Sequence, residues 1–137
     1  MKGVDEMSDQ TERNIEATKK GIGAFSTGDI ETMMSLFDDN IEWVQPGDSA
    51  ISGTYHGKSE LGQFFGRLAE KSATIAPRRF LADGDTVIVL SETTAGNETS
   101  EVAQVLTLRG GKVVQAHIYA DTAVMERVYG RKHVAAS

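Results

Sequence analysis

The stretch that decides the fold is Gly110-Gly111-Lys112-Val113-Val114-Gln115-Ala116-His117-Ile118-Tyr119-Ala120-Asp121-Thr122. Its two glycines are typical of a tight hairpin turn, because both central residues of such a turn need positive φ. The following residues alternate in polarity, and successive side chains of a strand point to opposite faces of the sheet. One face therefore carries Val114, Ala116, Ile118 and Ala120, and the other carries Gln115, His117, Tyr119 and Asp121.

The polar face of this strand has two interpretations. A strand with one apolar and one polar face is usually half-buried, with its polar face in water. Alternatively, the polar face lines a cavity, where an imidazole, a phenol and a carboxylate would form a binding or catalytic site. The alternation alone leaves both interpretations open.

Three further strands precede this one, separated by regular turn sequences. Asp83-Gly84, Gly96-Asn97 and Gly110-Gly111 divide the runs 75–81, 86–94, 98–108 and 112–121. Period-two strands joined by such short turns predict an antiparallel meander. Pro77 lacks a backbone donor, so the first strand is expected at a sheet edge or with a bulge at that residue.

Helical periodicity appears in the first half of the chain. We expect a helix from about Thr11 to Gly28, a second from Ile30 to Phe37 with Asp29 as its N-cap, and a third after Ser59 as N-cap. In the third helix, apolar residues at i, i+3, i+4 and i+7 are more typical of core than of a ligand wall; they are Leu61, Phe64, Phe65 and Leu68.

The remaining elements are short. Residues 41–45 and 54–56 are expected as strands, and Thr122 as the cap of a short last helix. Three helices must then cover one side of a curved sheet, which predicts an α+β fold whose cone shape leaves room for a ligand cavity. We expect one domain over residues 11–130, with a flexible N-terminal extension at 1–10 and a basic tail at 131–137.

Composition excludes several classes of function. The 137 residues carry a net charge of −6 and no cysteine, which argues against nucleic-acid binding, anionic membranes and thiol or cysteine-metal chemistry. The three histidines, His56, His117 and His133, have no metal-ligand spacing, and no phosphate-binding loop is present. The sequence contains no apolar signal core and no membrane-length apolar run, so we expect a cytoplasmic protein without metal or cofactor.

Several short pieces occur in a familiar order. They are Ala24-Phe25-Ser26-Thr27-Gly28-Asp29, Leu36-Phe37-Asp38-Asp39-Asn40-Ile41-Glu42-Trp43, Gly53-Thr54-Tyr55-His56-Gly57, Phe64-Phe65, Gly111-Lys112-Val113 and Tyr119-Ala120-Asp121-Thr122-Ala123. Together they resemble the SnoaL-like branch of the NTF2-like superfamily over about residues 10–130. The resemblance implies a cone-shaped barrel: a curved antiparallel sheet with three helices on its concave side and a deep pocket.

The resemblance also implies site residues. In SnoaL-like polyketide cyclases an aspartate near the end of the last strand acts as acid and base in an aldol closure, and Asp121 matches that position. His117, a second candidate catalytic residue, stands where the family commonly has arginine. The expected substrate-binding residues are Trp43, Tyr55, Phe64 and Tyr119, although Trp43 is equally well interpreted as a core anchor.

Two kinds of function follow as hypotheses. The first is a cofactor-independent cyclase or isomerase that acts on a small apolar carbonyl compound through Asp121. The second is a non-catalytic module that binds a small apolar molecule. An epoxide hydrolase is a lesser variant, because it needs a second acid and an arginine that the sequence does not assign.

Assembly is the last expectation. Family members commonly dimerise, and an exposed apolar sheet face usually marks an interface. We therefore expect a homodimer through the outer face of the sheet, involving residues such as Ile118 with Val105 or Leu106.

Overall fold

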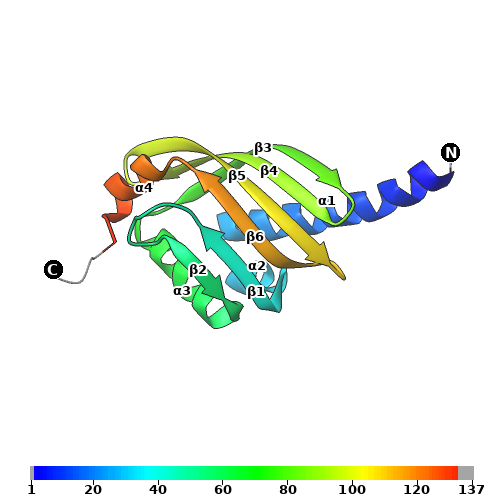
Figure 1. The fold of residues 1–137 in the computed structure, drawn as a ribbon, viewed down its shortest axis with the longest axis horizontal. Coiled ribbons are helices and arrows are strands. Elements are labelled where there is room, and N and C mark those ends of the chain that lie inside the picture. Colours follow the sequence, from blue (N-terminus) through cyan, green and yellow to red (C-terminus); the bar gives the residue numbers. More distant parts are fainter. Residues whose placement is uncertain (1, 133–137) are drawn as a thin grey trace.

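The computed structural model describes residues 2–132, with side chains from Asp9 onward. Four helices and six strands follow one another along these residues (Figure 1). They are α1 (Lys2–Thr27), α2 (Ile30–Ser35), β1 (Phe37–Gln45), β2 (Gly53–His56), α3 (Gly57–Glu70), β3 (Thr74–Asp83), β4 (Thr86–Ala95), β5 (Glu98–Arg109), β6 (Lys112–Ala120) and α4 (Thr122–Tyr129). The residues predicted as tail lie partly outside this range, since 133–137, including His133, are not described.

The strands form one curved, unclosed sheet in the order β2-β1-β6-β5-β4-β3. Strands β3 to β6 are an antiparallel meander, which confirms the prediction from the turn sequences. Gly110 and Gly111 both have positive φ, 59° and 77°, as the last hairpin turn requires. The sheet as a whole is mixed rather than antiparallel, because β1 pairs with β6 in parallel.

The edge strand β3 carries its proline where the ladder can tolerate it. β3 pairs only with β4 among the described strands, and their register shifts between Pro77 and Arg79. A missing N–H is harmless at such an irregular edge position. The expectation of an edge or bulged strand is therefore confirmed on both counts.

Helices cover the concave side of the sheet and enclose the core. Residues from α1, α2 and α3 join inward-facing strand residues in one buried cluster, among them Ala24, Met33, Phe64, Val89 and Val113. Figure 1 shows α4 beyond the end of β6, apart from the long helix α1. The cone-shaped α+β fold is thus confirmed, and α4 is the short last helix that was expected in addition to the three covering helices.

The observed helix starts differ from several predicted ones. Asp29 caps α2 as predicted, by accepting a hydrogen bond from the Thr32 N–H. α3 begins at Gly57, before the predicted cap Ser59, and Glu60 accepts from the His56 N–H at 2.8 Å. α4 is capped by Asp121 rather than Thr122.

The first helix begins earlier than its periodicity predicted. α1 starts at Lys2, whereas the expected start was near Thr11. Its later part packs on the sheet, where Asn14 donates to the Gly84 carbonyl and Thr18 is fully buried. None of the described helices is long and apolar enough to cross a membrane.

Candidate functional site: an apolar cavity in the cone

A cavity of about 160 Å³ lies between the concave face of the sheet and the helices. Every helix contributes to its wall: Phe25 from α1, Met33 from α2, Phe65 from α3 and Met125 from α4. The sheet contributes inward-facing residues such as Trp43, Val102, Gln104, Ile118 and Ala120. Most of the lining side chains are apolar, so the cavity favours an apolar occupant.

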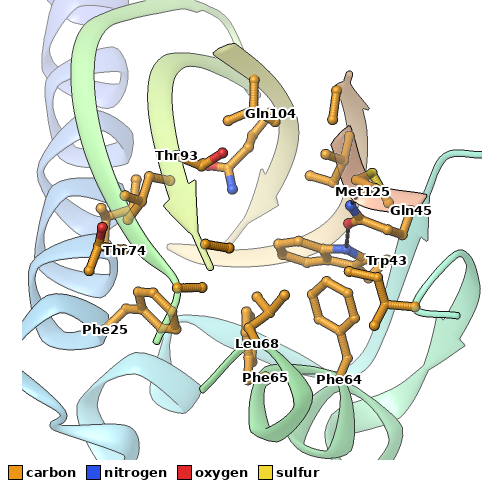
Figure 2. A pocket seen from close by; sticks show the side chains of 18 of the residues that line it. Phe25, Trp43, Gln45, Phe64, Phe65, Leu68, Thr74, Thr93, Gln104 and Met125 are labelled. Carbon is orange, nitrogen blue, oxygen red and sulfur yellow. Dashed lines mark hydrogen bonds between the residues drawn. The ribbon is translucent and has the colours of Figure 1, made fainter. Parts of the chain in front are cut away.

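Aromatic rings form one continuous wall of this cavity (Figure 2). The ring of Trp43 lies 5.4 Å from both Phe64 and Phe65, and Phe65 lies 5.8 Å from Phe37 and 6.0 Å from Phe25, between ring centroids. Such tilted and edge-on contacts hold the rings in place while leaving part of their surface to the cavity. Trp43 is therefore a core residue and at the same time part of the cavity wall. The two interpretations of this residue, core anchor and substrate-binding wall, do not exclude each other.

A few polar side chains interrupt the apolar lining. Gln45 accepts a hydrogen bond from the Trp43 indole N–H at 2.9 Å, and its amide nitrogen lies 3.6 Å from the Met125 sulfur. Figure 2 shows Gln104 and Thr93 on the sheet side of the same cavity. These groups are suited to orienting a ligand that carries oxygen atoms.

An ion pair lies beside α4 at the rim of the cavity. Arg127 donates to both carboxylate oxygens of Glu98, at 2.6 and 2.9 Å, and Glu98 lines the cavity. These hydrogen bonds hold the pKa of the Glu98 carboxyl below its usual value. Among the described lining residues the other titratable group is the Tyr129 phenol, whose pKa is raised by burial, so that it stays neutral.

The polar row of β6 lies outside the cavity, contrary to the expectation. Ile118 is 2% exposed and lines the cavity, whereas Tyr119 is 55% exposed. His117 is exposed too and stacks on Tyr119 with ring centroids 4.8 Å apart. The apolar residues of the strand face inward because that face must pack against the helices, which leaves His117 and Tyr119 on the outer face.

Asp121 follows the end of β6 and caps α4. Its Oδ1 accepts hydrogen bonds from the backbone N–H groups of Ala123 and Val124, both at 3.1 Å, and the residue is exposed. It does not line the cavity, but its neighbour Ala120 does, and its charge acts on the Glu98–Arg127 pair. Asp121 thus follows a cavity-lining residue in the sequence without lining the cavity itself, and its catalytic role stays a prediction.

The predicted substrate-binding residues divide into two groups. Trp43 and Phe64 line the cavity. Tyr55 packs its ring 4.9 Å from Phe64, and its hydroxyl donates to the Ile51 carbonyl at 2.6 Å, so it supports the wall from behind. Tyr119 lies on the opposite face of the sheet.

The sequence analysis did not identify Gln45 and Gln104 as cavity residues, although the order of polar and apolar residues in their strands indicates both. Gln45 is two residues after Trp43 and therefore shares its face of β1. Gln104 lies between Val102 and Leu106 on the inner face of β5, where an isolated polar residue interrupts an apolar row. The feature that indicated the cavity's polar groups was a single polar residue within an otherwise apolar, inward-facing row. A strand face that is polar along its whole length did not indicate them.

Metal chemistry has no evident ligand set in the part of the chain that the structure describes. No group of three His, Asp, Glu or Cys side chains there is arranged to hold a metal ion. His56 lies 4.0 Å from Glu42 on the outer face, far too loosely arranged for a coordination site.

Comparisons with known proteins agree with this fold and cavity. The fold described above is that of the NTF2-like class of proteins, and solved structures described as NTF2-like are among those that match. Bal32a, from a soil-derived mobile gene cassette, superimposes with a TM-score of 0.82 at 26% identity, covering 87% of this chain and 98% of its own. TerC, co-crystallised with polyporic acid, gives 0.77 at 26% identity over 85% and 98%.

The family follows from the sequence match. A family model described as the SnoaL-like domain matches residues 19–116, so the chain belongs to the SnoaL-like family. A putative ketosteroid isomerase from Kribbella flavida shares the fold, with a TM-score of 0.72 at 19% identity over 81% of this chain and 79% of its own. No curated protein matches the chain.

Proposed function

We propose that this protein binds a small, flat, apolar molecule in the cavity of the cone. The observation that carries the proposal is the aromatic wall of Trp43, Phe64 and Phe65 around a largely apolar space. Flat rings stack well against such a wall, and burial of apolar surface supplies the binding free energy. The relative TerC was crystallised with polyporic acid, which supports a small organic ligand.

Binding without catalysis is favoured over general acid–base chemistry by the titratable groups that line the cavity. Among the described lining residues these are Glu98 and Tyr129. The lowered pKa of Glu98 makes it a weak base, and the raised pKa of Tyr129 keeps its phenol neutral. A good general base needs a pKa near the working pH, which neither group has.

The test uses Trp43, the only tryptophan, as a built-in reporter. Titration with fluorenone, a flat three-ring ketone, should quench its fluorescence in a saturable manner. Ala120→Phe fills the cavity and should weaken binding about tenfold or more, equivalent to about 1.4 kcal/mol. Ala69→Phe is the matched control, because Ala69 is exposed on α3 and should leave the affinity unchanged. Equal affinity of the two variants would show that the ligand binds elsewhere.

Catalysis through Asp121 is the second candidate; His117, the other expected catalytic residue, lies on the outer face of the sheet and has no part in it. The observation in its favour is that Asp121 directly follows Ala120, which lines the cavity. An isomerase or cyclase acting on a small apolar ketone would lose about 10²–10⁴ in rate on Asp121→Asn. Asparagine still caps the helix, so the variant should fold. Unchanged turnover would show that Asp121 is not a catalytic base, and binding would then be the function that remains.

We also propose a homodimer through the outer face of the sheet. Cross-strand pairs place Leu81, Ile88, Val105 and Val44 in one row across this face with His117, beside exposed Leu90 and Tyr119. Ile118 and Leu106, which we expected at this interface, are buried on the inner face instead. An uncovered apolar sheet face suits a second copy related by two-fold symmetry.

Sedimentation tests this assembly directly. The wild-type chain should sediment as a dimer at tens of micromolar, and Val105→Glu should shift it to monomer by placing charges opposite each other. Lys112→Glu, at the far end of β6, serves as the control and should leave the dimer intact. A monomeric wild-type protein would remove the proposal.

A further inference from the structure

The amide of Gln45 is held in one orientation at the wall of the cavity. Gln45 ends β1 with its side chain on the concave side, and only 9% of the residue is exposed. An indole N–H is a donor only, so the atom that meets Trp43 at 2.9 Å must be the amide oxygen of Gln45. The amide nitrogen therefore points the other way, toward Met125 (Figure 2).

That nitrogen is poorly satisfied. Among the residues that the structure describes, its hydrogen-bond partner is the Met125 sulfur, at 3.6 Å. A thioether is a weak acceptor, whereas an amide nitrogen carries two N–H donors. A buried donor without a good acceptor costs free energy, and a ligand oxygen that reaches it recovers that cost. Met125 is unbranched and lines the cavity, so its side chain can move aside for such a ligand.

Gln104 differs in this respect. It also lines the cavity, but its side chain has no hydrogen bond to another described residue that would fix the amide. It can therefore present either its oxygen or its nitrogen to a ligand. Gln45 presents donors only and is thus the group that selects between ligand oxygens.

We propose that Gln45 is the specificity-determining residue of the cavity and donates a hydrogen bond from Nε2 to a carbonyl oxygen of the ligand. This inference rests on the proposed binding function and names its ligand class: flat aromatic ketones whose apolar body packs on Trp43 and Phe64. Compounds of the same shape without the carbonyl bind more weakly.

The experiment compares fluorenone with fluorene, which has the same ring skeleton without the carbonyl, and with fluorenol, which carries a hydroxyl donor. Calorimetry on the wild-type chain should give fluorenone about 3- to 10-fold tighter binding than fluorene, the ratio expected for one hydrogen bond. Gln45→Glu keeps an oxygen for the Trp43 indole but removes the amide donor. This variant should lose the preference for fluorenone over fluorene and bind fluorenol better than fluorenone.

Two further variants separate this role from mere packing. Gln45→Met has a similar volume and no donor, so it should bind fluorenone and fluorene equally. Gln104→Met removes the other cavity amide and changes the wall for both compounds alike. If Gln45 is the donor, the ratio of the fluorenone affinity to the fluorene affinity should stay as in the wild type, whatever the change in the two affinities themselves. Chemical denaturation of each variant checks that it is folded.

The outcomes distinguish the inference from the function on which it rests. If fluorene and fluorenone bind the wild type equally, or if Gln104→Met rather than Gln45→Glu removes the preference, the assignment of Gln45 is wrong while the cavity still binds apolar molecules. If neither compound binds the wild type, the proposed function fails and the assignment of Gln45 fails with it.

Discussion

The two faces of β6 carry adjacent residues into opposite surroundings. Ile118 is 2% exposed and lines the cavity, whereas Tyr119, the next residue, is 55% exposed on the outer face. The inner face of β6 lines the apolar cavity and brings no charged group into it. The outer face carries the imidazole of His117 and the phenol of Tyr119, the two groups that suggested chemistry. A side chain that could act as an acid or base therefore does not locate a functional site by itself. It must first be known which face of its strand the helices cover.

The largest expected effect tests which face is the core. Ile118→Ala should lower the free energy of unfolding by about 2–5 kcal/mol, because it leaves a cavity among packed side chains. Gln115→Ala, on the exposed face of the same strand, should change it by no more than about 0.5 kcal/mol. Urea denaturation of both variants measures the difference, and similar losses would contradict the assignment of the two faces.

Helix α1 shows the same contrast between a buried and an exposed face, at Gly21 and Gly23. A Cβ at Gly21 would clash with Leu36 Cδ2 and lie 3.2 Å from Leu36 Cβ, whereas one at Gly23 would meet nothing within 4 Å. Gly21→Ala should therefore destabilise the fold by about 1–3 kcal/mol, as expected for overpacking. Gly23→Ala should stabilise it by about 0.5–1 kcal/mol, because alanine suits a helix interior better than glycine. Thermal denaturation would refute this packing if both changes had the same sign.

Asp121 lies where the two faces end, and its role as a cap can be separated from any role as a base. Asp121→Ala should cost about 0.5–2 kcal/mol, since the N–H groups of Ala123 and Val124 lose their acceptor. Asp121→Asn should cost little, because asparagine caps helices about as well as aspartate. Urea denaturation of both variants provides the measurement; equal destabilisation would mean that the charge, rather than the cap, matters.

The smallest effect concerns the ion pair at the rim. Because the folded-state pKa of Glu98 is lowered, its contribution to stability is present above the unfolded-state pKa and is lost as pH falls through the folded-state value. The stability advantage of wild type over Glu98→Gln should therefore shrink from about pH 5 downward, past the ordinary glutamate pKa of about 4.3. An advantage that persists at the lowest pH at which both proteins fold would show that packing, rather than charge, holds α4. The side chains of Arg127 and Glu98 are 57% and 31% exposed, so solvent screens the pair and the effect on stability should be small.

The boundary between α2 and β1 shows where tertiary contacts override a local sequence pattern. Phe37 was expected at the end of the second helix, because it lies seven residues after Ile30, yet it begins β1 and pairs with Val113 of β6. The parallel pairing of β1 with β6 adds backbone hydrogen bonds that another turn of helix would forgo. No local pattern contains this pairing, since the partners lie far apart in sequence.

Other features were determined by the sequence itself. The turn at Gly110-Gly111, the cap at Asp29 and the irregular edge at Pro77 all appear as predicted, because each depends on the conformational limits of the residues that form it. The alternation of β6 sorted its residues correctly into two faces from Gln115 onward. It was wrong at the start of the strand, where an irregularity in the pairing with β5 buries Val113 instead of Val114.

Which of those faces points inward was decided only by the tertiary structure. A period of two divides a strand into two sets of side chains and does not say which set the helices will cover. The apolar stripes of α1 and α3 had to be buried, and they share one buried cluster with Ala116 and Ile118, which leaves His117 and Tyr119 outside. The same packing brought Trp43, Gln45 and Met125 together around the cavity, a meeting of β1 with α4 that only the folded chain can make.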